Sequence, residues 1–153
     1  MVNINMKEAT VNRKAYFDYE IMETYEAGIE LFGFEVKAIK TGHINLLGSF
    51  AVIKDGEMWL LNVSISAYQP KNAPPDYDPT RSRRLLLHKS EIKELIGKSA
   101  QKGLTIVSLK VYTKRNRIKV LLGLARHKKK TDKRELIRKR EAKLDIERVI
   151  KRG

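Results

Sequence analysis

Hydrophobic and polar residues alternate most clearly in two stretches of the chain, and each stretch predicts a β-hairpin. In 49–63, which reads "SFAVIKDGEMWLLNV", two alternating runs flank Asp55-Gly56, a two-residue turn that tolerates positive φ. In 104–125, which reads "LTIVSLKVYTKRNRIKVLLGLA", Asn116 is the turn residue best suited to the left-handed conformation. The two hairpins predict an antiparallel sheet.

The weaker patterns complete the expected elements. Residues 15–31 alternate imperfectly and predict a long strand or a bent pair of strands. Residues 34–41 lie between two glycines and have a helical spacing of apolar positions, so a short helix is expected. A second short helix follows 85–87, with His88 or Ser90 as its possible N-cap.

Two regions lack a regular pattern. Residues 1–12 show no periodicity and are expected to be frayed. Residues 66–84 contain all four prolines of the chain and predict a loop. Short antiparallel strands at this spacing favour a mainly β fold, namely a small closed barrel. The oligonucleotide-binding type is the natural candidate, although periodicity alone leaves the barrel topology open.

The charge of the chain is large and unevenly distributed. The net charge is +14, and it divides into −4 over residues 1–80, +10 over 81–125 and +8 over 126–153. This segregation favours a polyanionic partner, most simply a nucleic acid, over a basic protein that has no partner. No apolar run approaches the ~20 residues that span a bilayer, and no membrane partner is expected. The absence of cysteine excludes disulfides and fits an intracellular, cytoplasmic setting.

The last 28 residues predict a separate basic tail. Asp132 as N-cap would place Glu135 at N3, a capping-box arrangement that favours a helix. The apolar residues of this segment are too scattered for a broad core-facing stripe, and an isolated helix of this length is marginal in water. We therefore expect 126–153 to be disordered in the free protein and helical when phosphates neutralise it. The alternative is a helix docked on the body.

No motif predicts catalysis or a metal site. The three histidines, one of which is His88, are far apart in the chain, and no phosphate-binding glycine loop is present. Glu26 and Glu35 belong to a set of glutamates that are typical of exposed strand faces. Arg83, Arg84 and the basic second hairpin are better signals for contacts with RNA, and a solvated face is an equal alternative for the hairpin. We therefore interpret the chain as a binding protein rather than an enzyme, and we expect no cofactor.

From about Asn12 onward the sequence resembles the SmpB family of SsrA-binding proteins. The resemblance is carried, in order, by "NRKAYFDY", "ETYEAGIEL", "EVKAIKTG", "DGEMWL", "DPTRSRRLLLHKSEI", "KGLTIVSLKVY", "KVLLGLAR" and "KKKTDKR". It implies a six-stranded antiparallel barrel of oligonucleotide-binding type with short helices. It also implies that the chain binds transfer-messenger RNA (tmRNA) and brings it to stalled ribosomes for trans-translation, and that the tail enters the small-subunit decoding centre and the empty mRNA channel.

The resemblance also assigns roles to residues. Glu26, Leu86 and His88 match positions that hold the tRNA-like domain of tmRNA, next to Arg83 and Arg84. The ribosome-binding tail residues are Lys128, Lys129, Lys130, Asp132, Lys133 and Arg134. The expected organisation is a monomer with an RNA-binding body in 1–125 and a tail in 126–153. The alternatives from other classes are a general basic ribosomal or nucleoid-associated structural protein and an RNA-modifying enzyme.

The chain departs from the family pattern at three positions. His127 stands where the family often has Gly, Gly48 replaces a usual Asp, and Arg117 follows Asn116 where Asn-Gly is common. These differences concern local turn geometry, and they leave the family resemblance intact.

Overall fold

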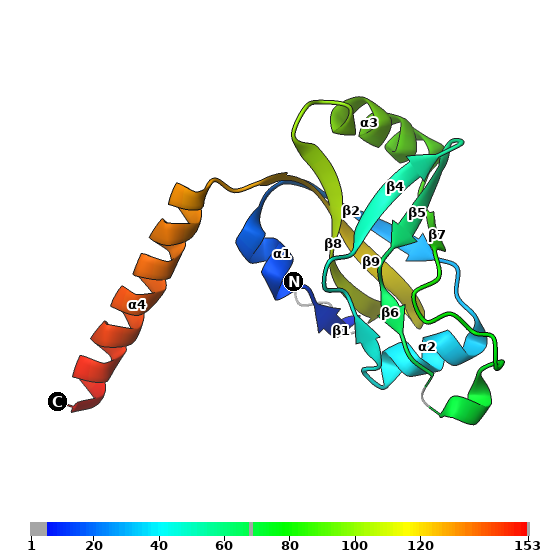
Figure 1. Cartoon of the computed structure of the whole chain (residues 1–153), viewed down its shortest axis with the longest axis horizontal. Helices are drawn as coiled ribbons and strands as arrows, with labels where there is room; N and C mark the ends of the chain where they lie inside the picture. Colours follow the sequence, from blue (N-terminus) through cyan, green and yellow to red (C-terminus); the bar gives the residue numbers. More distant parts are fainter. Residues whose placement is uncertain (1–5, 68, 153) are drawn as a thin grey trace.

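The computed structural model describes residues 6–67 and 69–152 and shows a mainly β body from which one long helix extends (Figure 1). Seven antiparallel strands form the main sheet in the order β1-β8-β4-β5-β7-β2-β9. These strands are β1 (Met6–Val11), β2 (Tyr19–Ile29), β4 (Phe50–Lys54), β5 (Glu57–Leu61), β7 (Arg83–Leu86), β8 (Leu104–Lys114) and β9 (Arg117–His127). The prediction of a mainly β, antiparallel fold with short helices is confirmed.

An additional pairing between β8 and β9 connects the two sides of the sheet. Because β8 also pairs with β4, six of the strands are linked in a ring of pairings: β8, β4, β5, β7, β2 and β9. β1 pairs with β8 and lies outside this ring. Two short strands, β3 (Ile44–Asn45) and β6 (Ser64–Ile65), form a separate two-stranded sheet.

Both predicted hairpins are present, and their turns use left-handed residues. Asp55 (φ 53°) and Gly56 (φ 75°) connect β4 to β5. Arg115 (φ 50°) and Asn116 (φ 64°) connect β8 to β9. Two consecutive residues with positive φ give a turn whose twist matches that of paired strands, so each turn aligns the strands that it joins.

The core lies on the inner face of the sheet. In β5 the side chains of Met58 and Leu60 are buried, whereas their neighbours along the strand are partly exposed, as the alternation predicts. A smaller cluster forms where β8 and β9 approach each other under the first helix. Gly123 is needed there, because a Cβ at this position would lie 2.9 Å from Cδ1 of Leu109.

The N-terminal region differs from the sequence prediction. Met6–Val11, predicted to be frayed, is the strand β1 paired with β8, and residues 1–5 lie outside the described part. The strand expected from residue 15 begins only at Tyr19, because Arg13–Asp18 forms a helix, α1. Asn12 explains this start: its Oδ1 accepts the N–H of Ala15 at 3.2 Å, and its Nδ2 donates to two backbone carbonyls of the body.

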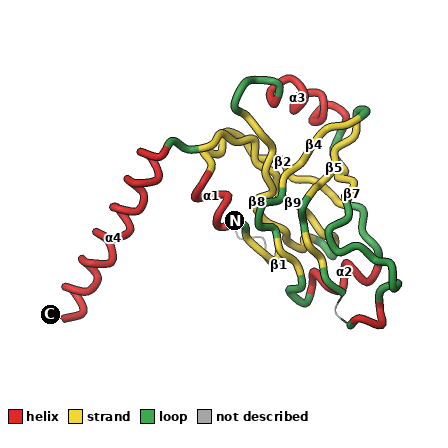
Figure 2. Tube along the Cα trace, viewed as in Figure 1, coloured by secondary structure: helices red, strands yellow, loops and turns green. Residues whose placement is uncertain are grey.

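The two predicted short helices are confirmed as α2 (Gly33–Lys40) and α3 (Lys89–Ser99) (Figure 2). His88 is the N-cap residue of α3, and its backbone N–H donates to Oε1 of Glu91 at 3.1 Å. The predicted loop follows β6 directly and contains a short 3₁₀ helix, η1 (Pro70–Asn72), and the first two residues of β7.

The C-terminal segment forms α4 (Lys130–Arg152), which extends away from the sheet (Figure 1). The helix begins two residues before the predicted cap, so Asp132 lies in its first turn rather than at its N-cap. β9 also continues to His127, beyond the expected boundary after 125. Leu144 and Ile146 are 52% and 60% exposed, so the body does not cover this part of α4. In the described residues, no helix is long and apolar enough to cross a membrane.

Candidate nucleic-acid interface

A groove of about 640 Å³ gathers four of the predicted RNA-binding residues. Its walls come from β2, β7, β9, the β4–β5 turn and the start of α3. Glu26, Arg84, Leu86 and His88 line it together with Lys119. These residues come from three separate stretches of the chain, and the fold brings them to one surface.

The register of three neighbouring strands places the side chains of the groove. Gly28 in β2 is opposite Leu86 in β7 on one side and Lys119 in β9 on the other. A Cβ on Gly28 would lie 3.3 Å from Cβ of Leu86, so the missing side chain allows the two strands a close approach. Leu86 is 45% exposed, which leaves an apolar side chain facing solvent in a mostly polar groove.

Glu26 is held in a defined position as an ionised acceptor. The hydroxyl of Tyr112 donates to Oε2 of Glu26, and Nζ of Lys114 lies 3.4 Å from the same oxygen. The Tyr112 hydrogen bond lowers the pKa of Glu26, and burial opposes this effect only in part. The Glu26 side chain is 37% exposed, so the carboxylate can still accept a hydrogen bond from a ligand.

Arg84 and His88 lie at the edges of the groove. Arg84 forms ion pairs with Glu30 at 3.5 Å and with Glu57 at 3.3 Å, and its side chain is 41% exposed. Two carboxylates therefore fix the direction of the guanidinium and offset its charge. The exposed side chain of His88 stands at the N-cap of α3, next to the first backbone N–H groups of the helix.

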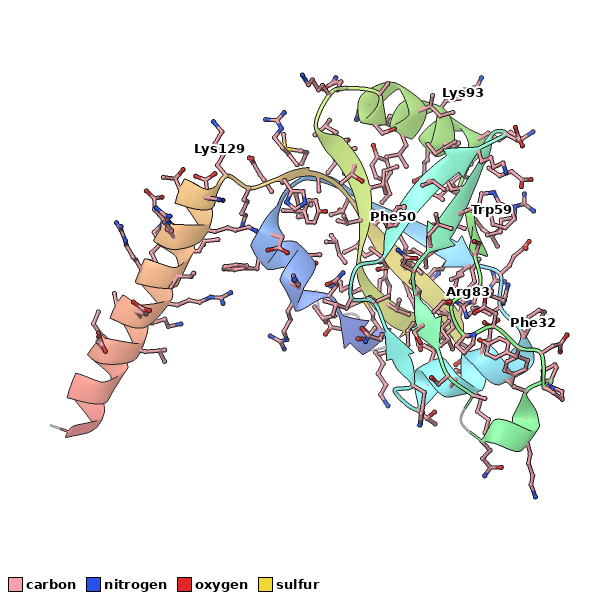
Figure 3. All side chains as sticks on the ribbon, in the orientation of Figure 1. Phe32, Phe50, Trp59, Arg83, Lys93 and Lys129 are labelled. Atoms are coloured by element: carbon pink, nitrogen blue, oxygen red, sulfur yellow. The ribbon has the colours of Figure 1, made fainter. Side chains whose placement is uncertain are left out.

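Arg83 is a correction to the sequence prediction, because its side chain is 0% exposed. Its Nη2 and Nε donate to Oε2 of Glu35 at 2.7 Å and 2.8 Å, and its Nη1 donates to the carbonyl of Val63 at 2.8 Å. Figure 3 labels Arg83 within the body, on the side of α2. Every second residue of β7 points inward, so Arg83 and Arg84 face opposite sides and only Arg84 reaches the groove.

Glu35 is a second correction, because it is 0% exposed and lies on α2 rather than on an exposed strand face. Besides Arg83, it accepts hydrogen bonds from Arg81, from the Tyr77 hydroxyl at 2.8 Å and from the Phe32 N–H at 2.8 Å. These bonds attach the proline-containing loop to α2. The helical spacing in the sequence could have predicted this burial, because Glu35 lies on the same helical face as the buried Ala38 and Ile39.

The Glu35 network predicts a loss of stability in acid. Burial raises the pKa of Glu35, but the hydrogen bonds from Arg81, Phe32, Tyr77 and Arg83 outweigh it and lower the pKa to about 2. A carboxyl group with a lowered pKa stabilises the fold above its unfolded pKa of 4.5, and this contribution is lost as the pH falls toward 2. We expect the free energy of unfolding to fall by on the order of 3 kcal/mol from Glu35 alone.

Urea unfolding at pH 5 and pH 2, with an NMR titration of the Glu35 carboxyl carbon, measures this effect. The Arg81→Gln variant is the control, because removal of one donor should raise the Glu35 pKa and make the stability less dependent on pH. A Glu35 carboxyl group that titrates near 4.5 in the folded protein would contradict the expectation.

The predicted tail residues lie outside the groove, and two of them contact the body. Nζ of Lys128 donates to the carbonyl of Tyr16 at 3.2 Å, and Nζ of Lys133 forms an ion pair with Asp18 at 2.9 Å. The other predicted tail residues are exposed, namely Lys129, Lys130, Asp132 and Arg134. Figure 1 shows α4 on the opposite side of the body from β7, and Figure 3 labels Lys129 at its start. Groove and tail are therefore two separate surfaces.

Sequence comparisons show a similarity along nearly the whole chain. A family model described as SmpB protein matches residues 9–152. An SsrA-binding protein of Synechococcus elongatus is 52% identical over 148 residues, covering 97% of this chain and 96% of that protein. An SsrA-binding protein of Caldicellulosiruptor saccharolyticus is 52% identical over 147 residues, covering 96% of this chain and 92% of that protein.

A similar solved structure is described as "tmRNA-SmpB: a journey to the center of the bacterial ribosome". Its chain is 49% identical to this one, with a TM-score of 0.66, and the match covers 88% of this chain and 95% of that chain. The likeness therefore extends to the three-dimensional arrangement of most of the residues.

Proposed function

Because the chain belongs to the SmpB protein family, we propose that it binds tmRNA and brings it to stalled ribosomes for trans-translation. The observation that carries this proposal is the groove in which Glu26, Leu86 and His88 meet, from three different elements. Their counterparts in the family resemblance are the residues that hold the tRNA-like domain. The name of the relatives, SsrA-binding protein, and the tmRNA named with the similar structure support the same ligand.

In this proposal the body binds the tRNA-like domain, and the tail occupies the decoding centre and the empty mRNA channel of the small subunit. The ring of six strand pairings supports a barrel of oligonucleotide-binding type for the body. We place the boundary after Lys129, since β9 runs to His127 and α4 begins at Lys130. The protein acts as a monomer in the cytoplasm, without cofactor, and catalyses no reaction.

The groove contains chemistry suited to a structured RNA rather than to any polyanion. Tyr112 and Lys114 hold the Glu26 carboxylate, and its exposed part can accept hydrogen bonds from base or sugar groups, which a surface that binds phosphates alone does not need. Lys119 supplies positive charge, Arg84 supplies guanidinium donors held by Glu30 and Glu57, and Leu86 supplies an apolar contact. A general basic ribosomal or nucleoid protein would gain nothing from this arrangement.

We expect Glu26→Ala to weaken binding of the tRNA-like domain roughly 5- to 150-fold, although it removes a negative charge. The loss of one acceptor leaves RNA donors unpaired, which costs about 1–3 kcal/mol. A generic polyanion binder should instead bind more tightly, because one repulsion is removed. Titration of the labelled tRNA-like domain at a fixed salt concentration measures the change.

Glu8→Ala is the matched control for Glu26→Ala. Glu8 pairs with Lys110 at 3.6 Å and lies on β1, outside the groove. Glu8→Ala removes the same negative charge beside the same basic hairpin, so it should leave binding of the tRNA-like domain unchanged or slightly tighter. Glu26→Gln keeps an acceptor for Tyr112 and should lose less affinity than Glu26→Ala. Tighter binding by both alanine variants would favour the general basic protein.

A further inference from the structure

The segment that joins the body to the tail contacts the C-terminal end of α1. The rings of Tyr19 and His127 lie 4.2 Å apart, at the first residue of β2 and the last of β9. Immediately afterwards, the Lys128 N–H donates to the Asp18 carbonyl at 2.9 Å, while its Nζ donates to the Tyr16 carbonyl at 3.2 Å. Lys128 thus satisfies two carbonyls at the C-terminal end of α1, where a cation is also favoured by the helix dipole.

The side chain of Asp18 extends this contact into the first turns of α4. Its Oδ1 lies 2.9 Å from Nζ of Lys133, and the side chains of the two residues are 15% and 30% exposed. The neighbouring Phe17 ring lies 6.0 Å from Nζ of Lys133 and 5.2 Å from the guanidinium carbon of Arg140. One carboxylate and one ring of α1 therefore engage two cations that lie two turns apart on α4.

From this geometry we propose that Asp18 is a positioning residue, which holds the first turns of the tail against α1 until an RNA phosphate takes its place on Lys133. The release step rests on the proposed function, because it requires a tail that binds RNA. The holding step does not, because it concerns the free protein. Lys133 is a tail residue expected to contact the ribosome, yet in this structure a carboxylate occupies the position that a phosphate would take.

The Asp18–Lys133 ion pair is weak enough to be reversible, as a releasable contact requires. A partly exposed ion pair contributes about 0.2–1 kcal/mol, enough to bias the direction of α4 and weak enough for a polyanion to displace. Asp18 supplies one charge, whereas an RNA strand presents a phosphate to each of several tail cations at once. Beyond Arg140, Leu144 and Ile146 are exposed, so the direction of α4 is set at its start.

The test is a distance measurement between body and tail. The chain contains no cysteine, so Lys93→Cys on α3 and Leu144→Cys on α4 can be spin-labelled at these two sites alone. Asp18→Asn in this background should lower the ratio of held to released tail roughly 1.5- to 5-fold. Asp18→Glu should retain most of the held population, and Lys133→Gln should lower it at least as much as Asp18→Asn, because it also removes the contact with the Phe17 ring. The double variant should match Lys133→Gln, because Asp18 and Lys133 form one ion pair.

Two results would overturn the holding role. One is an unchanged distance distribution in Asp18→Asn. The other is an equal loss in Asp18→Asn and Asp18→Glu accompanied by a lower melting temperature, which would show that α1 itself had unfolded. An effect of Asp18→Asn that persists undiminished in the Lys133→Gln background would assign the contact to a different partner.

Unstructured RNA tests the release step. A 12-nucleotide polyuridine added to the wild-type background should shift the distribution toward that of Asp18→Asn, with little further change when Asp18→Asn itself is titrated. Binding of this RNA without any shift would overturn displacement. Failure of the proposed function is a separate result, since it would appear as a wild-type chain that does not bind the tRNA-like domain.

Discussion

A chain that ends after Lys129 should bind the tRNA-like domain as tightly as the full chain and support no tagging of stalled products. The groove residues all precede this point, and Lys128 remains to cap α1. The missing segment carries 10 Lys or Arg and 5 Asp or Glu, and its removal deprives the protein of the surface proposed for the decoding centre and mRNA channel. RNA titration and a tagging assay with a message that lacks a stop codon measure the two activities separately.

A pair of substitutions in the full chain tests whether the tail must be helical. Ile146→Pro should impair tagging strongly while RNA binding stays unchanged, because Pro costs ~3 kcal/mol in a helix interior. Ile146→Ala removes the same exposed side chain and keeps the helix, so it should impair tagging less.

If the chain that ends after Lys129 fails to fold, or binds the tRNA-like domain much more weakly than the full chain, body and tail are not separable.

Amide exchange on the free protein measures how much of the tail is disordered. The contacts with α1 lead us to expect measurable protection in 130–140, and rapid exchange in 141–152, where the exposed Leu144 and Ile146 offer no packing. Ribosome binding should protect both parts. Strong protection throughout α4 in the free protein would mean that binding does not order the tail.

Arg83→Met should give the largest loss of stability among single substitutions considered for this chain, about 3–5 kcal/mol. The change leaves the fully buried Glu35 without two of its hydrogen bonds, and it also removes the donors to the carbonyls of Val63 and Pro79. A typical domain is stable by only about 5–15 kcal/mol, so the variant could lose much of its folded population. Urea unfolding at pH 7 measures the difference.

Arg84→Met is the matched control, because it removes the same charge from the adjacent position of β7. The ion pairs of Arg84 are exposed to solvent, so this change should cost no more than about 1 kcal/mol. Addition of Glu35→Leu to Arg83→Met should recover part of the loss, since the stranded carboxylate is then removed. Equal effects of the two arginine variants would show that the buried network contributes little.

Local patterns in the sequence were sufficient to predict the hairpins and the two short helices. Asp55-Gly56 and Asn116 are turn residues with a conformational preference, and each turn fixes a register of alternating side chains. β1 and α1 were not predicted, because their cause is not local. β1 depends on pairing with β8, and α1 depends on Asn12 bonding to carbonyls from two distant segments.

The candidate site was predicted only in part, because strand register and side-chain burial also depend on non-local contacts. The family resemblance selected Glu26, Leu86 and His88, and the strand register places them together. Arg83 was misassigned because adjacent arginines look alike in a sequence, while β7 turns one inward and the other outward. Composition also could not reveal that Lys128 and Lys133 contact α1, since charge counts carry no information about partners.

The single-partner strand β1 has a consequence for self-association. In the described part of the main sheet, each of the other strands pairs on both sides, so β1 is where another chain could add by backbone pairing. Its register with β8 shifts between Glu8 and Thr10, and Lys7 and Glu8 are exposed on it. An irregular, charged and short edge is a poor template for strand addition. These features of β1 disfavour edge-to-edge pairing between two copies of the chain.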